Sequence, residues 1–117
     1  MFRVIIAGSR SFRNFNLLVN KCDKILSAVQ EPIVIVSGTA QGADRLGERY
    51  AELRGYDIDR HPAQWEKFGK SAGYKRNVEM AKSADALIAF PVGATRGTQH
   101  MIKIATDTGM PVRVIQT

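Results

Sequence analysis

The sequence predicts an α/β fold in which helices cover both faces of a five-stranded parallel sheet, giving three layers. Short, nearly continuous apolar runs rich in β-branched residues, such as Ile33–Val36, are typical of strands buried on both faces. These runs alternate with longer segments whose apolar residues recur at helical spacing. Parallel neighbours need right-handed crossover connections, and a helix supplies each of them.

The expected strands follow the apolar runs and end at turn residues. The fourth ends at Pro91, and the third is the weakest because its apolar pattern is short. In chain order the strands are Phe2–Ala7, Ile33–Val36, Asp57–His61, Ala86–Phe90 and Val112–Ile115. We expect the spatial order 3-2-1-4-5.

The four expected helices lie between these strands. Asn14 is placed to cap the first, and Pro32 closes that segment because the residue before proline avoids helical angles. Gly55 is a typical helix stop. The segment Pro62–Gly73 is expected to be a long loop. In chain order the helices are Phe15–Val29, Ala43–Arg54, Tyr74–Ser83 and Thr98–Thr108.

In this strand order the carboxyl ends of strands 1, 2 and 4 meet beside the switch point, where open α/β sheets bind ligands. Two Gly-xxx-Gly loops follow strands 2 and 4 and precede helices, at Gly38–Gly42 and Gly93–Gly97. Free helix N–H groups can bind phosphate there. Neither loop is a G-x-G-x-x-G motif or a P-loop, so ordinary turn chemistry is the alternative.

Three arginines beside these loops, Arg10, Arg76 and Arg96, could supply bidentate forks to a phosphate. Each of these side chains could equally be solvated, and Arg76 could instead pair with Glu79. Asp44 could accept hydrogen bonds from ribose hydroxyls, or merely complement the dipole of its helix.

Two ring side chains near the expected site also have two interpretations. Trp65 could stack on a base, but we favour a plug at the end of the sheet. His100 could act as an acid or base, or be an exposed helix residue.

The bulk composition bounds the class of protein. The 117 residues suit one domain, 1–117, and the net charge of +6 favours anionic partners. The single Cys22 is expected to be buried, and its isolation predicts a reducing, cytoplasmic compartment. We expect no membrane span, no cofactor and no metal, because neither a long apolar run nor zinc-ligand spacing is present in the sequence.

These residues resemble the SLOG superfamily and, within it, the small YspA-like branch. The resemblance implies a Rossmann-like fold that binds nucleotides or nucleotide-derived ligands. Relatives often pair through helices, which implies a homodimer. The matching segments are Gly8–Arg10, Val36–Asp44, Gly69–Asn77, Ala84–Phe90 and Gly97–His100.

The superfamily includes the Lonely Guy phosphoribohydrolases, which cut the N-glycosidic bond of cytokinin nucleotides. Arg76 falls on their catalytic arginine, and Asn77 replaces the lysine that follows it. Met101 occupies the position of their catalytic glutamate, and a thioether cannot take up a proton. Their glycine loop has its counterpart here in Pro91, Gly93, Gly97 and Thr98.

The sequence thus favours a nucleotide-binding or sensing domain. One alternative is a nucleoside-monophosphate N-glycosidase, for which the catalytic candidates are Arg76, Asp44 and His100. Another is a nucleic-acid binding module, as in the related DNA-processing protein A family. The expected ligand-binding residues are Gly8, Ser9, Arg10, Ser37, Gly38, Thr39, Gly42, Asp44, Arg76, Asn77, Gly93, Arg96, Gly97 and Thr98.

Overall fold

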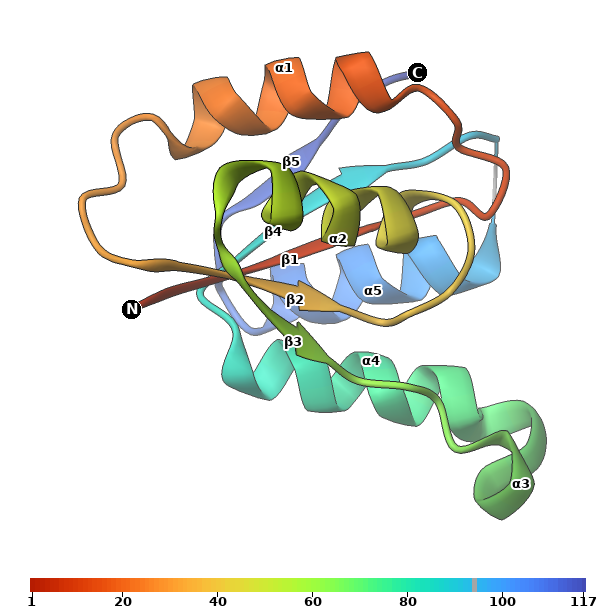
Figure 1. The fold of residues 1–117 in the computed structure, drawn as a ribbon. Coiled ribbons are helices and arrows are strands. Elements are labelled where there is room, and N and C mark those ends of the chain that lie inside the picture. The colour runs from red at the N-terminus through yellow and green to blue at the C-terminus, as the bar shows by residue number, and fades with distance from the viewer. Residues whose placement is uncertain (94) are drawn as a thin grey trace.

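A computed structural model describes residues 1–93 and 95–117 and shows a five-stranded parallel sheet (Figure 1). The spatial order β3-β2-β1-β4-β5 confirms the expected one. Ala94, inside the second glycine loop, lies outside the described residues. The strands are β1 (Phe2–Gly8), β2 (Ile33–Ser37), β3 (Asp57–Arg60), β4 (Ala86–Phe90) and β5 (Val112–Val114).

Helices cover both faces of the sheet (Figure 1). On one face lie α1 (Phe15–Leu26) and α2 (Ala43–Arg54), and on the other lie α4 (Ala72–Ser83) and α5 (Arg96–Asp107). The layers confirm the Rossmann-like sandwich.

Local capping explains where helices on the α1/α2 face begin and end. Asn14 caps α1, since its side chain accepts a hydrogen bond from the Leu17 amide (3.0 Å). Gly55 ends α2 in the left-handed conformation. The expected helix to Val29 was too long, because α1 ends at Leu26 and Val29 packs on the core from a turn.

The main error of the sequence prediction lies in Pro62–Gly73. This segment contains a one-turn helix, α3 (Trp65–Phe68), and a 3-10 turn, η1 (Gly69–Ser71), and it runs directly into α4. A single turn is too short to show a hydrophobic period, so the sequence pattern could not distinguish it from a loop. For the same reason the first turns of α4 and α5 extend two residues further than expected.

Two hydrophobic cores flank the sheet, and β1 contributes alternate residues to each. Ile6 faces the core with Tyr50, whereas Ile5 faces the core with Met80 and Met101. Cys22 is fully buried, as expected, and burial raises the pKa of its thiol to about 12. Nowhere in the described residues is there a helix with the length and apolar character that a membrane crossing demands.

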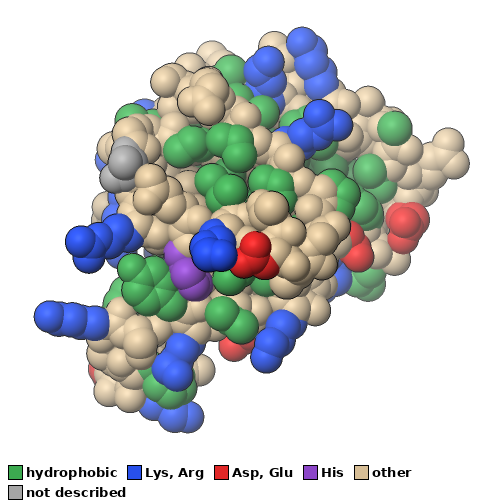
Figure 2. Space-filling model, turned by 180° about the vertical axis from the view of Figure 1, so that it is seen from behind, with side chains coloured by type: hydrophobic (Ala, Val, Ile, Leu, Met, Phe, Trp, Pro, Cys, Tyr) green, Lys and Arg blue, Asp and Glu red, His purple; other side chains and the backbone are tan. Residues whose placement is uncertain are grey.

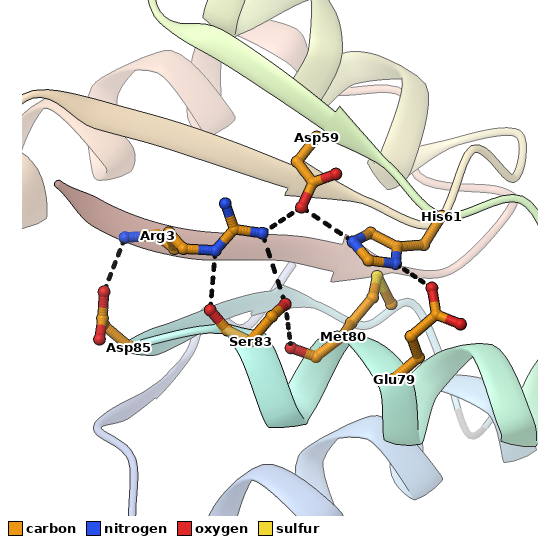
Figure 3. A network of polar contacts seen from close by, with 7 residues as sticks. All are labelled: Arg3, Asp59, His61, Glu79, Met80, Ser83 and Asp85. Carbon is orange, nitrogen blue, oxygen red and sulfur yellow. Dashed lines mark hydrogen bonds and ion pairs between the residues drawn. The ribbon is translucent and has the colours of Figure 1, made fainter.

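A polar network, which we call the edge clasp, joins β3 and β1 to α4 (Figure 3). It consists of Arg3, Asp59, His61, Glu79 and Ser83. His61 bonds Asp59 through Nε2 (2.9 Å) and Glu79 through Nδ1, while Arg3 pairs with Asp59 and donates from Nε to the Ser83 carbonyl (2.7 Å). The clasp thereby holds the chain leaving β3 against α4, just before α3.

The edge clasp predicts a loss of stability at alkaline pH. Only the imidazolium donates from both ring nitrogens, and hydrogen bonds to the two carboxylates raise the pKa of His61 in spite of burial. A group whose pKa is higher in the folded protein than in the unfolded chain stabilises the fold fully at pH values below its unfolded-state pKa. This stabilisation is lost as the pH rises through the folded-state pKa.

We therefore expect the melting temperature of the native protein to fall more than that of His61→Gln between about pH 6 and pH 9. Thermal denaturation followed by circular dichroism measures it. Parallel curves for both proteins would show that His61 does not titrate within the clasp.

Candidate ligand-binding site at the carboxyl edge of the sheet

A cavity of about 440 Å³ opens at the carboxyl edge of the sheet, between the loop after β1 and the first turns of α4 and α5. Small-molecule sites commonly measure about 300–1,000 Å³, so a nucleotide-sized ligand fits. The sequence-predicted residues that line it are Gly8, Ser9, Arg10, Asp44, Arg76, Asn77, Gly97 and Thr98.

Ser9 ties together the loops that form this edge. Its hydroxyl donates to the Val92 carbonyl (3.1 Å) and accepts from the Val92 amide (2.7 Å), which links the loops after β1 and β4. Its carbonyl accepts from the Ala43 amide (3.2 Å) at the start of α2. The loops after β1 and β4 and the start of α2 therefore meet at one rim, as the predicted strand order requires.

The glycines here pack against the protein's own chain. A Cβ on Gly42 would lie 2.5 Å from the Arg10 carbonyl oxygen, and one on Gly8 would lie 2.8 Å from the Ala43 side chain. A Cβ on Gly38 would meet both Arg76 and Asp44 at 2.8 Å. Gly38 and Gly42 thus permit close packing of the rim, although they do not line the cavity.

Arg76 is held in a fixed orientation in the cavity wall. Its Nε donates to Asn77 Oδ1 (3.0 Å), and its Nη1 donates to the Gly38 carbonyl. Burial lowers the pKa of the guanidinium, Asp44 raises it, and the charge of Arg10 lowers it. Arg76 does not pair with Glu79, which instead belongs to the edge clasp.

Asn77 joins the start of α5 to this wall. It is 6% exposed, and its amide nitrogen donates to the Gly97 carbonyl and to His100 Nδ1, each at 3.2 Å. The His100 ring packs edge-on against Tyr74 with a centroid separation of 4.5 Å. Burial lowers the pKa of His100, so the imidazole is neutral at physiological pH.

Asp44 contributes a carboxylate to the same cavity. It is 6% exposed, and its Oδ2 accepts a hydrogen bond from the Ala40 amide (3.1 Å). Burial raises the pKa of Asp44 to about 6, against the opposing effects of the Ala40 amide and the charges of Arg76 and Arg10. Among the described residues, no cluster of His, Cys, Asp or Glu side chains could hold a metal ion.

Two aromatic side chains line the cavity and remain accessible. Trp65 is 50% exposed and Tyr74 is 41% exposed. The expectation that Trp65 plugs the end of the sheet was wrong, because α3 carries it away from the sheet and packs it near Gly73 of α4.

The sequence did not single out several other residues of the lining. They include Tyr74, Met80 and Thr95, whereas Met101 was named from the resemblance, at the position of the catalytic glutamate. The Thr95 hydroxyl is buried without a hydrogen-bond partner in the described part of the chain. The two methionines follow the helical apolar period, a signal that indicates burial in a core but not exposure to a cavity.

Other predicted residues lie outside the lining. The Ser37 hydroxyl donates a hydrogen bond to Glu48 (2.6 Å). Thr39 adopts a left-handed backbone conformation, and its carbonyl accepts a hydrogen bond from Arg45 Nε (2.8 Å). Seven of the predicted site residues do not line the cavity: Ser37, Gly38, Thr39, Gly42, Gly93, Arg96 and His100.

Comparisons with known proteins agree with this architecture. The family model described as YAcAr, the YspA, cpYpsA-related SLOG family, matches residues 2–68. The Gene 61 protein of Mycobacterium phage D29 is 36% identical over an alignment of 118 positions, which covers 96% of this chain and 94% of that protein. Membership of this family indicates binding or processing of nucleotide-related molecules. The chain belongs to the YspA, cpYpsA-related SLOG family.

Proposed function

We propose that this protein binds a nucleotide or a nucleotide-derived phosphate ligand in the cavity at the carboxyl edge, as a sensor or binding domain. The observation that carries the proposal is the charge of the cavity lining. Arg10, Lys70 and Arg76 line it, and among its described lining residues Asp44 alone carries a carboxylate. A concave site with an excess of cations favours an anionic ligand.

The electrostatics of the two arginines support an anion in this position. Burial destabilises the charged form of Arg76 most, and the like charge of Arg10 adds to this effect, against the opposing attraction of Asp44. The two guanidiniums, which both line the cavity, therefore repel each other. A phosphate between them would relieve the repulsion and accept hydrogen bonds from both forks.

The rest of the lining suits the other parts of a nucleotide. The faces of Trp65 and Tyr74 can stack on a base, and the first turn of α5 presents backbone amides at Gly97 and Thr98. The floor is apolar, with Met80 and Met101. An apolar floor with a few polar groups at its edge is typical of small-molecule sites.

Arg10→Ala and Arg76→Ala test this function directly. Each removes one charged hydrogen-bonding partner, so affinity should fall about 10- to 150-fold. Arg96→Ala is the matched control, because Arg96 follows β4 as Arg10 follows β1 but does not line the cavity. Isothermal titration calorimetry with a panel of nucleoside mono- and diphosphates measures it. Affinities unchanged in both cavity variants would reject the site.

One observation favours a second function, hydrolysis of an N-glycosidic bond. Asp44 is a buried carboxyl group in the cavity with its pKa raised to about 6, a property that general acids and bases share. It would supply the carboxylate that is missing at Met101. Free base accumulating in the titration mixtures would identify the protein as a nucleotide N-glycosidase.

A nucleic-acid binding module is less well supported. In Figure 2 the Lys and Arg side chains are scattered around the visible face and do not form a continuous stripe. Affinity for single-stranded or duplex DNA that falls steeply with salt would favour that alternative.

A further inference from the structure

We propose that Asp44 accepts a hydrogen bond from a ribose hydroxyl, so that the cavity selects ribonucleotides over deoxyribonucleotides. This inference rests on the proposed function and specifies which class of nucleotide the site takes. It depends on the contacts of Asp44, on its position beside Arg76, and on the charge of its carboxyl group.

The first argument is an incomplete hydrogen-bond inventory. The residue Asp44 is 6% exposed, and among the described residues only Oδ2 of its carboxylate receives a hydrogen bond, from the Ala40 amide. No donor reaches Oδ1 within the described residues, and no cationic nitrogen there lies within ion-pair distance of the carboxylate. Among the described residues the Thr95 hydroxyl is the one buried polar side-chain atom without a partner, so Oδ1 is accessible from the cavity that Asp44 lines. An accessible acceptor without a protein donor is suited to a donor on the ligand.

The second argument is the position of the Asp44 carboxylate relative to Arg76, the arginine that is proposed to bind the phosphate. Gly38 has no side chain, and a Cβ there would lie 2.8 Å from Arg76 Nη1 and 2.8 Å from Asp44 Oδ2. Cation and acceptor are therefore neighbours on one wall of the cavity. A complementary ligand carries an anion and a neutral donor on one small framework, as a nucleotide carries its phosphate and sugar hydroxyls.

The charge of Asp44 supports a neutral donor and opposes a direct contact with phosphate. The ionised groups around it are Arg76 on α4, Arg10 after β1 and Glu48 on α2, and burial outweighs the two cations. The pKa of Asp44 is thereby raised to about 6. A carboxylate accepts a stronger hydrogen bond than a carboxylic acid, so the preference for ribose should grow as pH rises through about 6.

Calorimetry on the full chain with AMP, 2′-deoxy-AMP and 3′-deoxy-AMP tests the inference. We expect at least one deoxy ligand to bind the native protein about tenfold or more weakly than AMP. Asp44→Asn keeps the shape and the acceptor for Ala40 but removes the charge. It should bring the three affinities within about threefold, while deoxynucleotide binding holds or strengthens because a negative charge beside the phosphate is gone.

Asp107→Asn is the control, because Asp107 pairs with Lys103 on the exposed far end of α5. It should keep the ribose preference of the native protein. A titration of the native protein at about pH 5 and pH 8 gives a second readout that needs no variant, and a preference that does not grow with pH overturns the inference.

The outcomes separate this inference from the proposed function. Equal affinity of the native protein for all three ligands overturns the role of Asp44 and leaves nucleotide binding intact. Uniform weakening by Asp44→Asn with the ribose preference retained assigns Asp44 a structural role and also overturns it. Failure of every nucleotide to bind the native protein overturns both proposals.

Discussion

Replacing Gly42 by alanine should lower the free energy of unfolding by about 2–5 kcal/mol, from backbone strain and overpacking together. Gly42 has φ +80° and ψ −127°, a region that side chains with a Cβ rarely enter. The new Cβ would also lie 2.5 Å from the carbonyl oxygen of Arg10. Relief requires the loop after β1 to move, so both stability and the cavity wall would change.

Gly55→Ala is the matched control for this substitution. Gly55 also has a positive φ, +73°, but a Cβ there would meet nothing within 4 Å. Gly55→Ala should therefore lower the free energy of unfolding only by the backbone strain, about 1 kcal/mol. Urea denaturation of the three proteins measures the difference. If Gly42→Ala and Gly55→Ala lower the free energy of unfolding equally, the close approach of Gly42 to the loop after β1 does not contribute to stability.

Trp65→Ala should weaken nucleotide binding by about 1–3 kcal/mol, the range found when an aromatic stacking partner of a base is truncated. Trp65 is 50% exposed and lines the cavity, so we expect a base to reach a face of its ring. Because the lost contact involves only the base, affinity for ribose 5-phosphate should stay unchanged. Calorimetry with AMP and ribose 5-phosphate measures both.

Two further variants make the Trp65 prediction specific. Trp65→Phe keeps a smaller aromatic face and should recover part of the affinity for AMP. Leu53→Ala removes another exposed apolar side chain, on α2 and outside the cavity, and should have no effect on binding. If Trp65→Ala weakens ribose 5-phosphate and AMP equally, the residue shapes the cavity and does not stack on the base.

The fold could be derived from local patterns because each pattern has one low-energy solution. The apolar run Ile33–Val36 needs burial on both faces, and only a sheet covered by helices on both sides provides it. Short connections and right-handed crossovers then limit the strand order to very few possibilities. The cap at Asn14 and the stop at Gly55 follow from interactions within a few residues, so they too were predictable.

The composition of the site was predictable only where loops follow strands. Arg10 lies in the loop after β1, and Asp44 lies in the first turn of α2, the helix that follows β2, so strand order alone brings them to one edge. Arg96 obeys the same rule but does not line the cavity. Strand order places a loop at an edge and does not specify which way each side chain points.

The amino-acid sequence by itself determined the layers of the fold, the order of the strands and the edge at which the glycine loops meet, because these depend on periodicity and chain connectivity. Tertiary structure alone decided that Gly42 packs against the loop after β1, that Trp65 lines the cavity and that one oxygen of Asp44 receives no hydrogen bond from the described residues. Those features depend on contacts between residues far apart in the chain, whose geometry is set by the packing of whole elements.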